Sequence, residues 1–537
     1  MNTISLFITF LVFLLVSGSS QAITQCYFDK NVNSCKSVNA RMHCPSIEEC
    51  LSTFGDSYGT YEVIIQDGNY NSEDCPGLIE APISMNGSLT FKTPTVDKYA
   101  NFNCGDSQFI SINLQNYMVL NFTNLILSGS SQDRGGCVAI YVGDQEATVY
   151  FTNVKSIHGC TSQREGGFLY SQAIRNIFYN SYIANCQSQY SDGGAIHANI
   201  TYLFSSTFEN NVAAQSGGVA AGSKIFSSNS NFIGNSAQDG GCLSATTVMS
   251  VFNSSLISNS AINTGGALYA TCYLTIDVST FENCSASNGG AIYVESGMTI
   301  FNSVFDSNQA LYEGSGGAIF FQSLDNTSIS VFTTNFTNNW SGGKGGVIFI
   351  DSGSLYLQQT IFKNNSAVDS GGIIYGVNGP NLQVFNIFTS QFNDSYSGNN
   401  GGVMCSEQRY EDEEIVINLL GSTFNGNTAS NYAGGIYFEQ MPQSLIGGIF
   451  SNSKSSEKLS STFYSNSILQ ADIVNVTNTD STTLYQVPIY IESSFEYWKA
   501  IGVQGECYDG YATIDEFGNV LTCKCFPPAQ GSTCQLN

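Results

Sequence analysis

Proline, basic residues and charge in general are scarce in this sequence. Only 9 of the 537 residues are proline, and charged residues make up 11% of the chain, whereas 42% are hydrophobic. This composition excludes a disordered polyampholyte. The 17 basic residues face 42 acidic ones, which gives a net charge of −25. Nucleic acid and anionic membrane surfaces are therefore not expected as partners.

Histidine is also rare, and no motif implies a cofactor. The three histidines, His43, His158 and His197, have no metal-type spacing, so we expect their positions to be incidental. Calcium is the one ion that the acidic composition leaves open. The acidic residues are spread thinly, however, and the one compact run, at residues 411–414, is expected to be a solvated loop between two repeats.

Long apolar runs are absent after the first residues. Residues 4–16 are apolar and precede a small-x-small pattern that ends at Ala22, which predicts a signal peptide over residues 1–22. No later segment has about 18 consecutive apolar residues, so no transmembrane segment is expected after cleavage. We therefore expect a secreted, extracellular protein.

Cysteine, by contrast, is abundant. All 17 cysteines lie downstream of residue 22, which fits an oxidising compartment. Because this number is odd, at least one thiol cannot pair within the chain. Eleven Asn-x-Ser/Thr sequons agree with a glycoprotein that passes through a secretory pathway.

Glycine marks an internal repeat. A Gly-Gly pair followed by two or three apolar residues recurs at steps of 23 to 33 residues. The pairs begin at Gly135, Gly166, Gly193, Gly217, Gly240, Gly265, Gly289, Gly316, Gly345, Gly371, Gly401 and Gly434. The apolar segments are rich in β-branched and aromatic residues and are too short for helices. The variable step suits loops of changing length inserted into a constant coil.

A second motif, Phe-x-x-Asn, lies between the glycine pairs. It occurs at Phe208-Asn211, Phe232-Asn235, Phe305-Asn308, Phe336-Asn339, Phe362-Asn365, Phe424-Asn427 and Phe463-Asn466, and Leu256 replaces the aromatic residue before Asn259. Short strands of one such coil cannot bury their apolar face alone, so successive coils must stack. Stacking places the Phe side chains in an internal ladder and lets each Asn amide bond the next coil.

These motifs predict an all-β fold, namely a right-handed parallel β-helix (solenoid) with disulfide-rich caps. The Gly pair suits a turn that needs φ > 0 or a close backbone approach. The paired motifs, for example in residues 289–293 and 305–308, resemble the repeats of the chlamydial polymorphic outer membrane proteins over residues 135–466. That resemblance implies a β-helical passenger that is displayed outside the cell and used in adhesion. Members of the family end in a membrane β-barrel, for which residues 485–537 are too few, so we expect free secretion.

The two ends of the repeat array are expected to carry caps. Residues 47–51 and 63–70 are similar to the opening of pectin-lyase-like proteins, in which a short helix precedes the first coil, and six cysteines between Cys26 and Cys104 are expected to staple this cap. The last four cysteines, Cys507, Cys523, Cys525 and Cys534, resemble the end of an EGF-like module. The expected division is a signal peptide at 1–22, a Cys-rich N-terminal cap with the first coils at 23–105, the repeat β-helix at 106–484 and a small Cys-rich C-terminal cap at 485–537.

Three cysteines occupy the Asn place of the turn motif. Two of them, Cys160 and Cys186, belong to adjacent coils, which puts their Cα atoms about 4.8 Å apart. Since disulfides span about 4.4–6.8 Å, we predict a Cys160–Cys186 bridge. The third, Cys284, has Asn259 and Asn308 in the flanking places and is the expected free thiol.

The candidate catalytic residues are the carboxylates Glu295 and Asp351. Each lies six residues after the first Gly of its coil, so both belong to one stacked column with Gln322 between them. Two coils correspond to about 9.6 Å, near the upper end of the range of about 6.5–9.5 Å between the carboxyls of inverting glycosidases. The alternative is that both are polar residues at strand ends without a catalytic role.

The sequence favours binding over catalysis. A long face rich in Asn, Ser, Thr and Tyr suits contact with an extracellular glycan or a cell-surface protein through hydrogen bonds and ring stacking. We therefore expect an adhesin-like or carbohydrate- or protein-binding surface and no enzymatic activity. The alternatives are a structural matrix or coat protein, and a polysaccharide hydrolase or lyase of the pectin-lyase-like fold.

Overall fold

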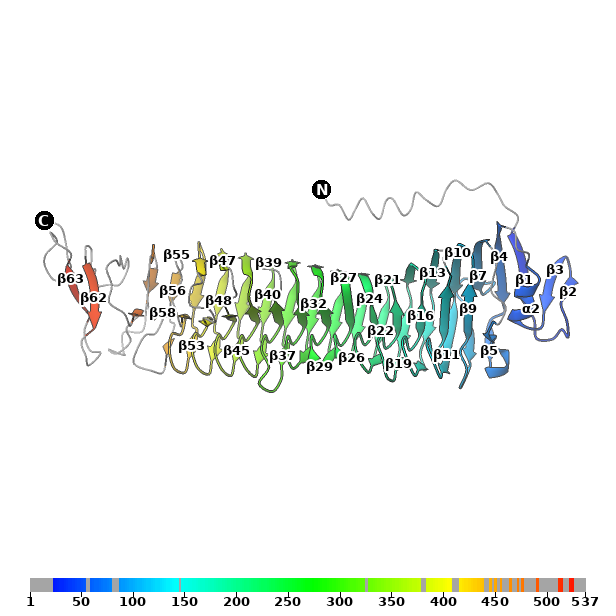
Figure 1. Ribbon diagram of the computed structural model, residues 1–537, viewed down its shortest axis with the longest axis horizontal. Coiled ribbons are helices and arrows are strands. Elements are labelled where there is room, and N and C mark those ends of the chain that lie inside the picture. Colours follow the sequence, from blue (N-terminus) through cyan, green and yellow to red (C-terminus); the bar gives the residue numbers. More distant parts are fainter. Residues whose placement is uncertain are drawn as a thin grey trace.

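The chain stacks into a long rod of short parallel strands (Figure 1). The computed structural model describes residues 23–54, 58–79, 86–143, 146–323, 327–377, 383–407 and 415–438, with short strands between 444 and 525. It is nearly all β, 2% helical, and forms a parallel β-solenoid of about 12 turns. The predicted all-β solenoid is therefore confirmed. The proposed signal peptide and the acidic run at 411–414 lie outside the described residues.

One coil in the middle of the rod illustrates the repeat. It comprises β34 (Ile292–Val294), β35 (Met298–Phe301), β36 (Val304–Asp306) and β37 (Gln309–Ala310). The next coil comprises β38 (Ile319–Gln322), β39 (Ser328–Phe332), β40 (Asn335–Thr337) and β41 (Trp340–Ser341). Each strand pairs in parallel, residue for residue, with its equivalent in the next coil. Equivalent residues consequently form straight columns along the rod.

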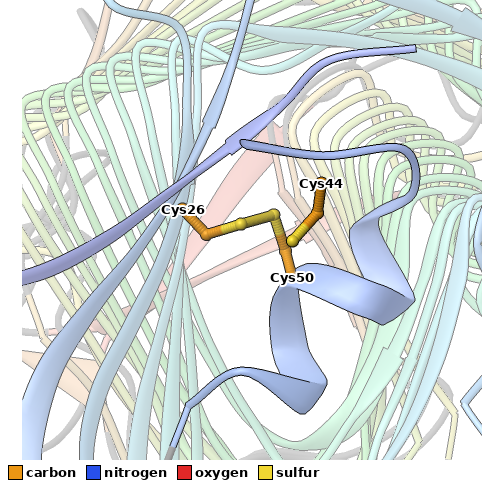
Figure 2. A group of neighbouring side chains, drawn as sticks. All are labelled: Cys26, Cys44 and Cys50. Atoms are coloured by element: carbon orange, nitrogen blue, oxygen red, sulfur yellow. A yellow bond between two sulfur atoms is a disulfide. The ribbon is translucent and has the colours of Figure 1, made fainter. Parts of the chain in front are cut away.

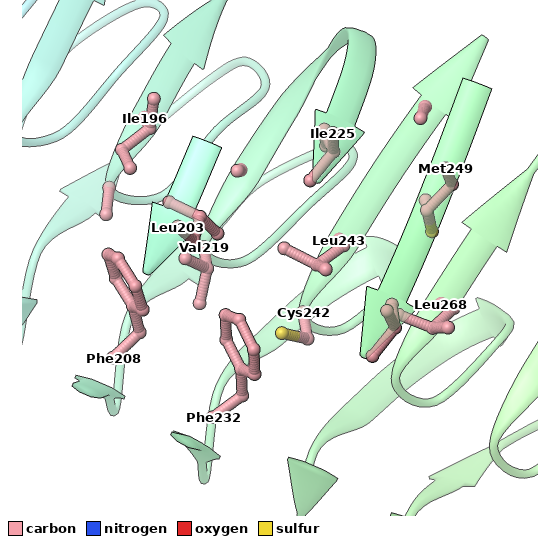
Figure 3. Packing of buried hydrophobic residues seen from close by; sticks show 14 of the residues in the cluster. Ile196, Leu203, Phe208, Val219, Ile225, Phe232, Cys242, Leu243, Met249 and Leu268 are labelled. Carbon is pink, nitrogen blue, oxygen red and sulfur yellow. The ribbon is translucent and has the colours of Figure 1, made fainter. Parts of the chain in front are cut away.

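The Phe of the turn motif forms a column inside the solenoid. Phe305 stacks on Phe336 with ring centroids 4.8 Å apart, and Phe336 stacks on Phe362 at 5.0 Å. All three rings have no exposed surface, which confirms the predicted internal ladder. Figure 3 shows how Phe208 and Phe232, one coil apart, pack against Leu203, Val219 and other apolar side chains of the core. Burial of such large rings is the main stabilising contribution of each coil.

The Asn of the same motif forms a second internal column. The Oδ1 of Asn339 accepts hydrogen bonds from both the backbone N and the Nδ2 of Asn308, each at 3.0 Å. Its own Nδ2 donates to the carbonyl of Phe305 at 3.0 Å. Asn308 and Asn339 are fully buried. Since an unpaired buried amide would cost free energy, the coils that carry this Asn depend on their neighbours for these hydrogen bonds.

The two glycines of each pair are required for different reasons. The first glycine of every pair from Gly135 to Gly401 has φ between 58° and 72°, a conformation that side chains disfavour. The second glycine has ordinary φ but touches the next coil. A Cβ at Gly290 would lie 2.1 Å from the carbonyl oxygen of Gly317. The sequence offered two explanations for the Gly pair. The need for a positive φ holds for the first glycine, and the close approach of another backbone holds for the second.

The first coils carry a helix and three disulfides. Helix α2 (Ile47–Ser52) begins after Ser46, whose side chain accepts a hydrogen bond from the backbone of Glu49. Disulfides join Cys26 to Cys50, Cys35 to Cys44 and Cys75 to Cys104. Cys44 lies beside the Cys26–Cys50 bridge (Figure 2). The expected stapling of the N-terminal region by these six cysteines is confirmed.

The C-terminal region is described only in short pieces. Strand β62 (Gly510–Ile514) pairs antiparallel with β63 (Leu521–Cys525). Cys507 and Cys534 lie outside the described residues, so the EGF-like cap and the proposed domain limits stay predictions. No helix in the described part of the chain is long and apolar enough to cross a membrane.

The prediction of a Cys160–Cys186 disulfide is wrong. Cys160 is bonded to Cys137, with the Cα atoms 5.5 Å apart, and Cys186 is a buried thiol. The expected stacking exists, because β15 (Cys160–Ser162) and β19 (Gln187–Ser188) pair in register. However, stacked side chains of parallel coils point the same way, so the Sγ of Cys186 lies 3.3 Å from the backbone N of Cys160. A disulfide needs Cβ atoms that point toward each other.

Cys284 is a buried thiol, as predicted. Cys242 and Cys272 share this state. The Sγ of Cys284 lies 3.4 Å from the carbonyl oxygen of Leu256, where the Asn of other coils donates its amide. The thiol therefore occupies the position that the turn-motif Asn has in other coils, and its neighbours in this column are Asn259 and Asn308, so no sulfur lies next to it there.

Candidate functional site

A column of outward-facing rings follows the strands that come after the Gly pairs. These strands are β30 (Leu268–Ala270), β34, β38, β42 (Ile348–Asp351) and β46 (Ile374–Val377). The rings are Tyr269, Tyr293, Phe320, Phe349 and Tyr375, called here the aromatic column. Successive centroids are 5.5, 5.2, 4.6 and 5.6 Å apart. These are spacings at which aromatic side chains stack favourably.

The hydroxyls of this column donate to a parallel row of polar side chains. Tyr269 Oη donates to Glu295 Oε1 at 3.2 Å, and Tyr293 Oη donates to Gln322 Oε1 at 2.6 Å. Tyr375 donates in the same way to Glu407. Each acceptor lies two residues after the column position of the next coil. These three acceptors, Glu295, Gln322 and Glu407, together with Asp351, which holds the same position beside Phe320, are called here the acceptor row.

Burial and the neighbouring carboxylates keep these hydroxyls protonated. Burial raises the pKa of Tyr293 to about 12, and the charges of Glu295, Asp351 and Asp239 act in the same direction. Burial also raises the pKa of Tyr269, with a further contribution from Glu295. The tyrosines are therefore neutral hydrogen-bond donors at physiological pH.

Both carboxylates singled out in the sequence belong to the acceptor row. Gln322 pairs in register with Asp351, and Val294, which precedes Glu295, pairs with Phe321, which precedes Gln322. Glu295 and Asp351 thus lie two coils apart, about 9.6 Å by the interstrand spacing. The hydrogen bond from Tyr269 gives Glu295 a structural partner. A catalytic role for the pair stays a prediction.

The chain places its own cations on two rings of this face. Lys344 Nζ lies 4.4 Å from the ring centroid of Tyr375, 2.7 Å from its hydroxyl and 2.8 Å from Glu407 Oε2. In an earlier coil Arg134 lies 4.8 Å from the ring centroid of Tyr170 and 2.7 Å from Glu165 Oε2. A cation over a ring and beside a carboxylate combines cation–π attraction with an ion pair.

A neutral hollow lies over the second strands of the same coils. It has a volume of about 360 Å³. This space is called here the neutral hollow, and it is lined by Ser328, Ser330, Phe332, Ser354, Leu355, Tyr356, Val384 and Asn386. They come from β39, β43 (Ser354–Gln358) and β47 (Gln383–Phe388). None of these residues carries a charge at neutral pH, and the hollow combines hydroxyls, an amide and two rings.

The rings of the hollow continue a second outward stack. The centroids of Phe301 and Phe332 are 5.0 Å apart, and those of Phe332 and Tyr356 are 5.3 Å apart. The hydroxyl of Tyr356 donates to Gln358 Oε1 at 3.1 Å. Ser354 Oγ accepts from the backbone N of Val384 at 3.1 Å. The polar groups of the hollow are thus held in place by the coils that carry them.

Sequence reasoning did not single out these residues. A usable signal exists in residues 328–332, where Ile329 and Val331 alternate with Ser328, Ser330 and Phe332. Alternation of this kind puts the serines and Phe332 on the outer face of a strand. The aromatic column was hidden for a different reason, because segments such as residues 347–350 are apolar throughout.

Comparison with known proteins agrees with this solenoid. The Chlamydia polymorphic membrane protein repeat matches residues 333–351. This segment runs from the Phe-x-x-Asn strand β40 through the Gly345 pair to β42, so it contains both motifs of the coil. The resemblance noted in the sequence is confirmed at the level of the repeat and the solenoid fold. No curated protein is detectably similar to the chain.

Proposed function

We propose that the protein is a secreted, adhesin-like binding protein that holds a neutral glycan in the neutral hollow on its outer face. The hollow is the observation that carries the proposal. Hydroxyls and an amide supply hydrogen bonds to sugar hydroxyls, and the exposed edges of the stacked rings of Phe332 and Tyr356 offer apolar surface to a sugar ring. The absence of charge among its lining residues favours a neutral glycan over an acidic one.

Two further observations support an extracellular role. The repeat that matches residues 333–351 is named for membrane proteins of Chlamydia, which agrees with display or release at a cell surface. The predicted signal peptide at residues 1–22 and the eleven sequons point in the same direction. A structural coat role would use the same rod but would need no ligand.

The proposal is tested on a glycan array with the secreted protein and two alanine variants. Phe332→Ala removes a ring of the hollow, and Tyr190→Ala removes an exposed tyrosine elsewhere. We expect the parent and Tyr190→Ala to bind the same neutral glycans, and Phe332→Ala to bind them about five- to thirtyfold more weakly, since one ring–ligand contact contributes on the order of 1–2 kcal/mol. Equal binding by all three proteins would contradict the proposal.

The second candidate function, polysaccharide cleavage, rests on Glu295 and Asp351 and is tested in parallel. The parent, Glu295→Gln and Asp351→Asn are incubated with neutral and acidic polysaccharides, and new reducing ends or unsaturated products are measured. We expect no cleavage by any of the three. A rate in the parent that either variant loses would establish an enzyme in place of the binding protein.

A further inference from the structure

The two cation sites on the face of the aromatic column have features in common. Arg134 and Lys344 each stand directly before a Gly pair, and each lies over a ring of the following coil. The covered rings, Tyr170 and Tyr375, are only 8% and 2% exposed. A carboxylate completes each site, Glu165 in one and Glu407 in the other.

Tyr269 also has carboxylates nearby, but among the described residues no lysine or arginine lies over its ring. The residue before the Gly pair of the preceding coil is Asp239, where Arg134 stands in the site at Tyr170. The ring of Tyr269 is half-buried, more exposed than the two covered rings. Over the part of the chain that the structure describes, no ion pair includes Asp239 or Glu295.

The free face of the Tyr269 ring is bordered by small residues. Tyr293 stacks on one side of it at 5.5 Å. On the other side the column continues with Ser244 and then Ala221. In the same way Ala139 precedes Tyr170 in the column, and there Arg134 reaches the ring. The ring of Tyr269 thus follows a small residue as the ring of Tyr170 does, whereas Lys344 reaches Tyr375 although Phe349 stacks on that ring.

We propose that Tyr269, Asp239 and Glu295 form a docking site for a lysine or arginine side chain of a basic partner protein. The partner's cation takes the place over Tyr269 that Arg134 takes over Tyr170, and the two carboxylates pair with it. An arginine suits the site best because its planar guanidinium stacks on a ring and pairs with a carboxylate at once. The net charge of −25 attracts such a partner over a distance. This site is separate from the neutral hollow.

The test uses the full secreted chain and a synthetic peptide that alternates arginine with glycine and serine. A peptide with citrulline in place of arginine has the same shape without the charge. Binding is measured by fluorescence anisotropy for the parent, Tyr269→Ala and Glu295→Gln. The controls are Tyr273→Ala, an exposed tyrosine outside the column, and Glu313→Gln, an exposed carboxylate. Circular dichroism checks that each variant is folded.

We expect the arginine peptide to bind the parent, and both site variants to lose at least fivefold in affinity while the controls stay within twofold. In addition, Asp239→Arg should supply an internal cation and abolish peptide binding, whereas Glu73→Arg at a distant exposed position should not. Equal losses in Glu295→Gln and Glu313→Gln would show a bulk charge effect and overturn the site. Binding of the citrulline peptide, or of a chitosan oligomer in place of the arginine peptide, would overturn the basic protein as partner. Phe332→Ala should leave peptide binding intact, so failure of the glycan proposal is recognised separately.

Discussion

At the scale of single residues, the direction of a side chain decides its role. Phe332 and Phe336 are four residues apart, yet Phe336 is fully buried in the core ladder and Phe332 lines the outer hollow. The sequence predicted the inward position of Phe336 because the Phe-x-x-Asn motif repeats. It could not predict the Cys160 partner, because spacing places stacked Cα atoms close together but does not make their side chains converge.

The sequons at Asn335 and Asn339 give a prediction about glycosylation. Asn339 is fully buried and its amide makes hydrogen bonds to Asn365 and Phe305, whereas Asn335 is exposed. We expect glycan on Asn335 and none on Asn339 when the protein is produced in a eukaryotic secretory host. Glycopeptide mapping by mass spectrometry measures the occupancy of each site. A fully occupied Asn339 would contradict the internal ladder.

The state of the cysteines near the first Gly pairs is a second prediction. Burial raises the pKa of the Cys186 thiol to about 11, and the thiolate is the form that alkylating reagents attack. We expect Cys186 to resist iodoacetamide in the native protein at pH 8 and to react once the protein is denatured. Peptide mapping without reduction should recover Cys137 linked to Cys160. Recovery of a Cys160–Cys186 peptide would refute the observed pairing.

His197 gives a prediction about pH. It stacks on Tyr170 at 5.9 Å, and burial lowers its pKa below the usual value, against the opposing charges of Asp192 and Glu165. As the pH falls, His197 therefore takes up a proton at a higher pH in the unfolded chain than in the folded chain. The contribution to stability is present above the unfolded pKa of about 6.5 and is lost as the pH falls.

We therefore expect the melting temperature of His197→Phe to fall less than that of the parent when the pH is lowered from 7.5 to 5. His158→Phe serves as the control because His158 is exposed. Differential scanning calorimetry of the three proteins at both pH values provides the comparison. If the His197 and His158 variants respond to acid in the same way as the parent, the half-buried imidazole of His197 has no part in the pH dependence.

At the scale of elements, most of the coil could be read from the sequence. The Gly pair, the short apolar strand and the Phe-x-x-Asn turn were all identified, because each residue repeats in one column. The aromatic column was not identified. In parallel strands whose outer residues are also apolar, as in β42, the alternation that separates inner from outer faces disappears. The neutral hollow could not be foreseen either, since it needs side chains from three coils.

The glycine pair provides the prediction at this scale. Alanine at position 290 would place its Cβ 2.1 Å from the carbonyl oxygen of Gly317, so neighbouring coils would have to move apart. We expect Gly290→Ala to destabilise the protein by about 1–3 kcal/mol or more, as overpacking does. Gly143→Ala is the matched control, because the nearest atom to its Cβ, the carbonyl oxygen of Leu114, is 3.7 Å away.

Thermal melting followed by circular dichroism measures both glycine variants beside the parent. The midpoint of Gly290→Ala should fall clearly below that of the parent, while Gly143→Ala should stay close to it. A Gly290→Ala variant that melts with the parent would mean that the coils tolerate a wider spacing than the structure has.

At the scale of the whole molecule, the rod combines a self-supporting core with a long, acidic outer face. Coils stabilise each other through the Phe and Asn columns. Equivalent residues on the outer face have the same coil-to-coil spacing. Ligand groups are consequently arranged in rows, with a neutral section at the hollow and an anionic section around Tyr269. A rigid row of this kind can bind an extended partner at several points, which suits adhesion better than turnover of a substrate.

The net charge of −25 leads to the last prediction, which concerns calcium. Among the described residues, one group of three His, Cys, Asp or Glu has ligand atoms within 4.8 Å, namely Cys26, Cys44 and Cys50, and all three sulfurs are in disulfides. We therefore expect divalent cations to act by screening the repulsion between dispersed carboxylates. Calcium chloride and magnesium chloride at equal ionic strength should raise the melting midpoint equally, relative to the protein in EDTA. Because Ca²⁺ takes more oxygen ligands than Mg²⁺ and accepts irregular geometry, a specific site would separate the two curves. A larger rise with calcium, saturating at micromolar concentration, would show that such a site exists and contradict this account.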